Sequence, residues 1–243
     1  MAINKKNAAE NKETIVIEPI KLVKTEVVLI GETPLLVHAW SEKSKRMMLE
    51  SQQKLNKAKK AKPVRDPFSE FMHAAYWITE MPKEDTPEAF EEAVADGAKF
   101  GFKTIAIKEA TLAAAYRAGY IPNQVGMRCN FYLNSTDYYN GDPGMELAAI
   151  ETPEPPFLRE DPVKIGGASK TADLRYRPEF RNWRIRVKIT LIDTGVFSMS
   201  SIVNALNLAG QMNGIGEWRM ERGGDFGRFH VATDEELREL KIS

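Results

Sequence analysis

Hydrophobic and polar positions along the chain predict an alternation of strands and helices. The first apolar segment, residues 15–40, is rich in Val, Ile and Leu and favours extended structure, because β-branched side chains fit a pleated sheet. Gly31 and Pro34 interrupt it, and we expect a bend or bulge there. Short apolar runs at 127–133 and 146–151 predict two further strands.

Helical patterns occupy the region between the first strand and these two. Residues 41–62 are helix formers with few apolar positions and many lysines, which indicates a solvated helix or one that lies against a partner. Asp66-Pro67 and Thr86-Pro87 each place a capping residue before a proline and predict two helix starts. Residues 103–118 predict a packed helix. The proline-rich segment 152–162 predicts a connector or an edge strand.

Residues 171–191 predict two strands around a turn at 178–182. Arg175 and Arg177 alternate with Leu174 and Tyr176 on the first strand, and three further basic residues alternate with apolar ones on the second. Alternate side chains share one face of a strand. One hairpin face is therefore predicted to carry five cations: Arg175, Arg177, Arg184, Arg186 and Lys188. Neighbouring cations repel unless anions lie between them. A phosphate backbone would supply those anions, and so would Asp173, Glu179 or acidic residues from 63–158; both interpretations stay open.

A glycine-rich segment, 210–229, follows a predicted helix at 198–209 and leads into a predicted strand at 226–232. Glycine lets a backbone approach a ligand, guanidinium groups pair with phosphates, and aromatic rings stack on bases. The candidate binding residues here are Gly214, Gly216, Trp218, Arg219, Arg222, Gly223, Gly224, Phe226 and Arg228. The alternative is a long connection in which glycines serve turns and Trp218 fills the core. The segment matches neither a Walker A loop nor a Rossmann fingerprint.

Composition limits the classes of protein to consider. The chain is 43% hydrophobic and 28% charged, which excludes global disorder. Its length of 243 residues corresponds to one large domain or two small ones. Basic and acidic residues balance at 34 each, so attraction to nucleic acid must come from local patches. Residues 1–62 carry a net charge of +6, residues 63–158 carry −8 and residues 159–228 carry +4. Pairing of these stretches within the fold, or between subunits, is the simpler interpretation.

Location and catalysis are constrained by what the sequence lacks. It has no apolar run of about 20 residues and no apolar signal region at its start, so we expect no membrane span and no secretion. A single cysteine, Cys129, excludes an internal disulfide and fits a reducing cytoplasm. The three histidines show no zinc-binding spacing and no Gly-x-Ser-x-Gly is present, so we expect no enzyme, no metal and no cofactor. If the protein used a metal ion after all, Asp173 and Asp225 would be the candidates for that role, and this is the weakest of the alternatives.

The order of predicted elements reads as β-α-β followed by β-α-β. It predicts an α+β fold, a ferredoxin-like (RRM/RAMP-like) antiparallel sheet with helices on one face. We expect a flexible N-terminus at 1–14 and a single domain at 15–243 with a helical insertion at 41–100. The open face of RRM-type sheets binds single-stranded nucleic acid.

The helix, the glycine- and arginine-rich loop and the final strand resemble the RAMP superfamily, the Cas7-like RNA-binding proteins of CRISPR complexes. The segments VKIGGASKTADLRYRPEF and GIGEWRMERGGDFGRFHV also resemble uncharacterised phage and prophage proteins, most strongly over the C-terminal third. The resemblance implies a subunit that oligomerises along single-stranded DNA or RNA through backbone contacts, as a homo-oligomeric filament. The insertion would then act as a thumb or inter-subunit arm.

Three functions follow as hypotheses. The first is a phage-encoded, Cas7-like binder of single strands, in which the basic residues named above contact phosphates. Its candidate stacking residues are Trp218, Phe226, Tyr138 and Tyr139. The second is a structural or protein-interaction module, including an inhibitor or mimic of a CRISPR subunit, whose arginine-rich faces contact proteins. The third is a metal-dependent nuclease.

Overall fold

The computed structural model describes residues 19–40, 42–53, 64–136, 146–165 and 171–240. Its strands are β1 (Leu22–Gly31), β2 (Leu35–Leu36), β3 (Gly101–Lys103), β4 (Phe131–Ser135), β5 (Leu147–Glu151), β6 (Phe157–Ile165), β7 (Thr171–Phe180), β8 (Arg184–Ile192) and β9 (Phe229–Val231). Its helices are α1 (Glu42–Gln52), α2 (Pro67–Ala74), α3 (Pro87–Ala95), α4 (Thr104–Arg117), α5 (Gln124–Arg128), α6 (Met199–Met212) and α7 (Asp234–Glu239), with a 3₁₀ turn at Met220–Arg222. The chain is thus a mixed α+β protein with antiparallel sheets.

Six strands form the main sheet, in the order β3-β5-β8-β1-β9, with β4 also paired to β8. The central strand is β8, which pairs along its length with β1 and shares its other side between β4 and β5. Ser135 of β4 lies opposite Val187, and Ile150 of β5 lies opposite Ile185. Strand β5 therefore continues the line of β4 along the same side of β8.

The hydrophobic core lies between this sheet and a layer formed by α4 and α6, which pack against each other. Ile185 and Val187 of β8 are fully buried and belong to one apolar cluster with Ile107 of α4 and Leu206 of α6. The side chain of Ser198 caps α6 by accepting a hydrogen bond from the Ser201 N–H (3.1 Å). Burial of one face of the sheet leaves the basic side chains of β8 on the other.

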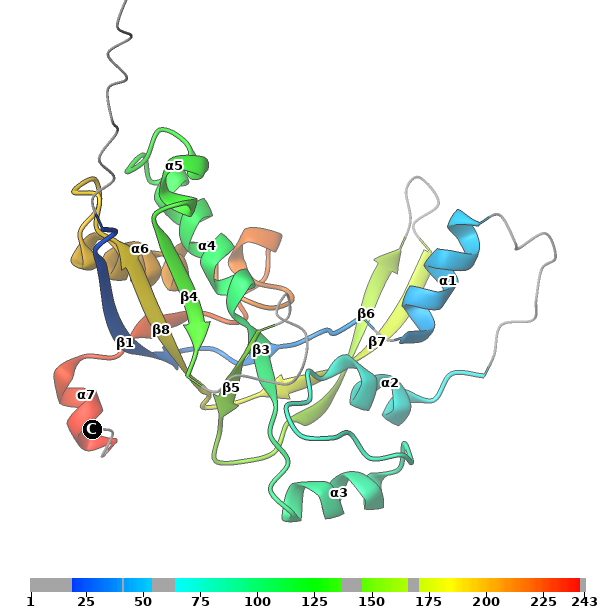
Figure 1. Cartoon of the computed structure of the whole chain (residues 1–243). Helices are drawn as coiled ribbons and strands as arrows, with labels where there is room; N and C mark the ends of the chain where they lie inside the picture. The colour runs from blue at the N-terminus through cyan, green and yellow to red at the C-terminus, as the bar shows by residue number, and fades with distance from the viewer. Residues whose placement is uncertain (1–18, 41, 54–63, 137–145, 166–170, 241–243) are drawn as a thin grey trace, which may run out of the picture.

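A second, three-stranded sheet has the order β2-β7-β6. Strands β6 and β7 form a long hairpin whose ladder runs from Phe157 opposite Glu179 to Ile165 opposite Thr171. Helix α2 packs on β7. In Figure 1 this hairpin lies with α1 and α2 at one side of the molecule, while α4, α5 and α6 lie at the other. The three helices α1 to α3 fall within 41–100, the expected insertion.

Several sequence predictions are confirmed. The predicted break in the first apolar segment separates β1 from β2. Asp66 and Thr86 cap α2 and α3 as expected, and both helices begin with proline. Strand β6, in the proline-rich region, is an edge strand of its sheet. No helix among the described residues is long and apolar enough to cross a membrane.

Two predictions were wrong. Strands β7 and β8 do not form a hairpin, because β7 pairs with β2 and β6 while β8 pairs with β1, β4 and β5. Asn182 has a left-handed backbone (φ 49°), and Trp183 is buried, so the chain turns from one sheet into the other. The strand predicted at 127–133 begins only at Phe131, because Asn123 caps the short helix α5.

The end of β1 depends on a glycine without a side chain. A Cβ at Gly31 would overlap the buried indole of Trp183, whose Nε1 donates to the Thr33 carbonyl (2.8 Å). We expect Gly31→Ala to lower the free energy of unfolding by about 1–3 kcal/mol, the cost of overpacking. Urea unfolding followed by circular dichroism measures it. The control is Gly126→Ala, where a Cβ has room, and an equal loss in both variants would contradict the explanation.

Candidate nucleic-acid interface

A row of cations lies on the face of the main sheet that points away from the core. Arg184, Arg186 and Lys188 alternate along β8 with buried apolar residues. Alternate residues of a strand are about 6.5 Å apart, so the three charges form a line along β8. The sequence predicted this alternation correctly for these three residues.

The two arginines of this row are half-buried and have no ion-pair partner in the described part of the chain. No hydrogen bond or ion pair within the described residues joins the guanidinium group of Arg184 or Arg186 to another side chain. Glu151 lies across the strand from Arg184 without reaching it. Lys188 differs, because its Nζ lies 3.4 Å from Glu26 of β1. A half-buried guanidinium group without a carboxylate favours an external anion.

An exposed aromatic ring lies beside this row. Tyr132 of β4 is opposite Thr190 of β8, and half of its surface is exposed. The Nζ of Lys108, from α4, lies 5.5 Å from the centre of the Tyr132 ring. An exposed tyrosine next to cations is a typical stacking surface for a base. Sequence reasoning missed Tyr132, because only the register with β8 reveals which face of its strand it occupies.

The basic residues of β7 lie elsewhere and are mostly neutralised. Arg177 is 3% exposed, and its Nη2 donates to Asp161 of β6 (2.7 Å). The Nε of Arg175 lies 3.6 Å from Asp173. The five predicted cations therefore do not share one face, since two belong to the second sheet and three to the main sheet. Arg177 has carboxylate partners within the chain, Asp161 and Glu217, although neither is among the partners expected from the sequence, whereas Arg175 lies beside the expected Asp173.

The glycine-rich loop contacts the β6–β7 hairpin through arginine–aromatic stacking. The guanidinium group of Arg177 lies 5.1 Å from the centre of the Trp218 ring, and that of Arg159 lies 4.7 Å from Phe226. Glu217 adds an ion pair with Arg177 (3.7 Å). Trp218 and Phe226, predicted as base-stacking residues, thus use ring faces to attach the hairpin to the main body.

Glycines of this loop serve close packing of the chain on itself. A Cβ at Gly224 would overlap the Trp218 carbonyl, and one at Gly216 would overlap the Leu36 carbonyl. A Cβ at Gly214 would lie 2.9 Å from the Phe226 carbonyl oxygen. Gly223 has nothing near it, but its φ of 78° is one that side chains rarely adopt. Close packing and backbone conformation therefore explain these glycines, and no bound ligand is needed to account for them.

The three loop arginines differ in their availability. Arg219 donates to Glu221 (2.9 Å) and to the Gly216 carbonyl (2.9 Å). Arg228 lies 3.1 Å from Asp225. Arg222 is exposed, and no described side chain pairs with it. The predicted stacking residues Tyr138 and Tyr139 and the expected flexible terminus at 1–14 lie outside the described residues.

A partly buried histidine, His38, follows β2 and lies close to Glu217 of this loop. Burial lowers the pKa of His38 from its usual 6.5, with Arg175 and Arg177 acting in the same direction and Glu217 and Glu70 opposing them. Its buried Nδ1 has no hydrogen-bond partner among the residues that the structure describes. The folded state therefore favours the neutral ring, and the stability that this provides is lost as the pH falls below about 6.5.

We expect His38→Phe to flatten the pH dependence of stability between pH 7.5 and 5.5, because phenylalanine cannot take up the proton. Urea unfolding midpoints at both pH values, for the wild type and the variant, measure this. His73→Phe is the control, since His73 is bound to Asp85 (3.1 Å) at the surface. Equal pH dependence in the wild type and His38→Phe would show that His38 does not titrate on unfolding.

Neither the arrangement of possible metal ligands nor the comparison with known proteins assigns a function to this chain. No group of three or more His, Cys, Asp or Glu side chains in the described parts of the chain could hold a metal ion. No protein-family model matches the sequence, and no curated protein matches it. The case for function therefore depends on the geometry of the residues described above.

Proposed function

We propose that this chain binds single-stranded nucleic acid on the face of the main sheet that carries Arg184, Arg186 and Lys188. The observation that carries the proposal is the pair of half-buried arginines without a carboxylate partner among the described residues. Phosphates would supply the missing anions, and Tyr132 would stack on a base. Backbone contacts of this kind read no particular sequence.

The arrangement of strands supports a ferredoxin-like, RAMP-type plan for this proposal. Strands β9, β1, β8 and β4 lie side by side in that order and pair antiparallel, with α4 and α6 as the two crossover helices. We take this order as support for a split β-α-β fold, whose helix-free face binds single strands in RRM-type proteins. The projecting β6–β7 hairpin and the helices within 41–100 are then additions to the common plan (Figure 1).

A filament extends the same proposal. Repeated head-to-tail contacts between identical subunits give an open assembly that follows a strand. The acidic residues of 63–158 in one copy would meet the basic region of 159–228 in the next. A phage-encoded protein acting in the host cytoplasm fits this role.

The first test is the binding of fluorescent single-stranded 30-mers of DNA and RNA, with particle size measured in parallel. Three phosphate contacts give a salt slope of about −2, so raising the salt from about 50 to 200 mM should weaken binding by roughly tenfold or more. Growth into long particles with added strand supports the filament. Absence of binding to either strand at low salt would end the proposal.

A second candidate, a protein-interaction module, is favoured by a different observation. Arg159 and Arg177 are committed to acidic and aromatic groups of the same chain, so the arginine-rich hairpin is a structural element. Oligomers that persist as the salt concentration rises and that do not bind nucleic acid would support this function.

A further inference from the structure

The short helix α7 is attached to the edge strand β9 by a histidine that lies between two carboxylates. The Nε2 of His230 lies 2.8 Å from Glu236 of α7, and its Nδ1 lies 3.1 Å from Glu32, which follows β1. Hydrogen bonds with the Thr233 N–H and with His230 lower the pKa of Glu236 to about 2, so this carboxylate is ionised at neutral pH. The start of α7 is therefore held beside β9.

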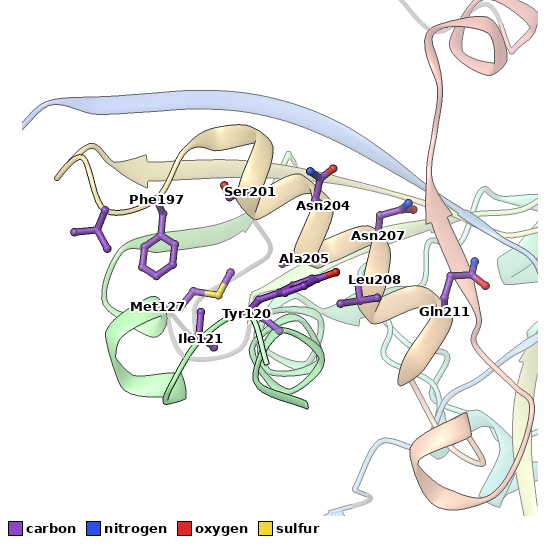
Figure 2. Close-up of a pocket in the computed structure, with 12 residues that line it drawn as sticks. Tyr120, Ile121, Met127, Phe197, Ser201, Asn204, Ala205, Asn207, Leu208 and Gln211 are labelled. Atoms are coloured by element: carbon purple, nitrogen blue, oxygen red, sulfur yellow. The ribbon is translucent and has the colours of Figure 1, made fainter. Parts of the chain in front are cut away.

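Strand β9, which carries His230, is held at both of its edges. One edge pairs with β1. At the other edge, Asn207 of α6 accepts a hydrogen bond from the Val231 N–H (2.9 Å), and Gln211 donates one to the Phe229 carbonyl (3.2 Å). These two amides also line a pocket of about 670 Å³ between α4, α5 and α6 (Figure 2), but their hydrogen bonds belong to the sheet edge. The position of His230 is therefore set by the sheet.

The strand register places His230 on the same face of the main sheet as the cations of β8. Ile30 of β1 lies opposite Arg184 of β8 on one side and opposite His230 of β9 on the other. Residues directly opposite each other share a face, and neighbouring strands are about 4.8 Å apart, so the backbones of His230 and Arg184 are about 10 Å apart across the sheet. The residues next to His230, Phe229 and Val231, belong to the core side instead.

Helix α7 brings negative charge to the edge of this face. It contains four acidic residues and one basic residue. Leu237 and the following Leu240 are half-buried, so their side of the helix lies against the protein, whereas Asp234, Glu235 and Glu239 are exposed. Figure 1 shows α7 apart from α4 and α6, the helices that cover the other face. The exposed carboxylates therefore lie beside the cationic row of β8.

We propose that α7 is an autoinhibitory element of that cationic row, an inference that rests on the proposed function of the row. Its carboxylates repel the phosphates of an approaching strand and so weaken binding. The repulsion acts through space, because the arginines of the row have no ion-pair partner in the described part of the chain. It depends on salt, since the Debye length is about 30 Å at 0.01 M and about 8 Å at 0.15 M.

The test measures binding of a fluorescent single-stranded 30-mer to the full-length wild type and to Glu235→Gln with Glu239→Gln. Both side chains are exposed, and glutamine keeps their size while removing the charge. We expect the double variant to bind about three- to tenfold more tightly at about 20 mM salt, and less than about twofold more tightly at about 150 mM. The matched control is Glu84→Gln with Glu88→Gln, which removes the same charge at the same spacing near the start of α3. Its affinity should stay within about twofold of the wild type.

A change of the opposite sign gives a second, independent readout. Arg238→Glu makes the exposed side of α7 more acidic and should weaken binding at about 20 mM salt. Wild-type binding that neither α7 variant alters, in proteins with unchanged circular dichroism spectra, would overturn the autoinhibitory role and leave the proposed function standing. Equal gains in the glutamine variant and its control would also overturn that role, because net charge would then be the cause. Absence of binding by every protein at low salt would end both proposals.

Discussion

Reversing the charge of Arg184 and Arg186 together should weaken binding of single strands by about 100-fold or more at low salt. A charge-assisted hydrogen bond contributes about 1.5–3 kcal/mol, and about 1.4 kcal/mol corresponds to tenfold in affinity. Arg184→Glu with Arg186→Glu removes two such contacts and places carboxylates beside the phosphates. Fluorescence anisotropy at several salt concentrations measures both the affinity and the salt slope, which should fall by more than one.

The matched control is Lys83→Glu with Lys99→Glu. Both lysines are exposed near α3, and the pair changes the net charge by the same amount. At about 150 mM salt we expect the control to retain most of the affinity, because long-range charge is screened there, and the two double variants are compared at that salt concentration. Equal losses in the two double variants would mean that net charge, and not the β8 row, governs binding.

Asp161→Ala should lower the free energy of unfolding by about 3–5 kcal/mol. Asp161 is 2% exposed and accepts hydrogen bonds from Arg159 (2.8 Å) and Arg177 (2.7 Å). Its removal leaves the buried guanidinium group of Arg177 with Glu217, at 3.7 Å, as its nearest described carboxylate. An uncompensated buried charge carries a cost of this size. Urea unfolding followed by tryptophan fluorescence measures the loss.

Two comparisons separate charge from packing in this prediction. Asp173→Ala, on the same hairpin but with a partly exposed side chain, should cost about 1 kcal/mol or less. Asp161→Ala with Arg177→Met should recover part of the loss, because the charge is then gone. A double variant that is less stable than Asp161→Ala would assign the effect to a cavity.

Local signals made much of the fold predictable from the sequence. Asp66 and Thr86 before prolines located two helix starts, and alternation along β8 assigned Arg184, Arg186 and Lys188 to one face. These features depend on neighbours within a few residues, which a single sequence displays directly.

Pairing between distant segments was harder to predict from the sequence. Nothing near Asn182 distinguishes a hairpin turn from a crossover between sheets, because the partners of β7 and β8 lie far away in the sequence. The glycine-rich loop posed the same difficulty. Gly216 and Gly224 pack against Leu36 and Trp218, so their role is clear only once the chain is folded. Arg177 looked like a phosphate contact because its partner, Asp161, lies on another strand.

The central position of β8 has a consequence for biosynthesis. The first strand of the main sheet, β1, has β8 as its long partner, yet about 150 residues separate them. At about 5–20 residues per second, a ribosome needs roughly 10–30 s to make that stretch. Throughout this interval β1 has no partner strand, and β4 has none from its synthesis until β8 is made. A nascent chain that stops before β8 therefore exposes unpaired strands. Chaperone binding during translation should continue until α6 and β9, which end at residue 231, have left the ribosome, because α6 covers the core and β9 pairs with β1.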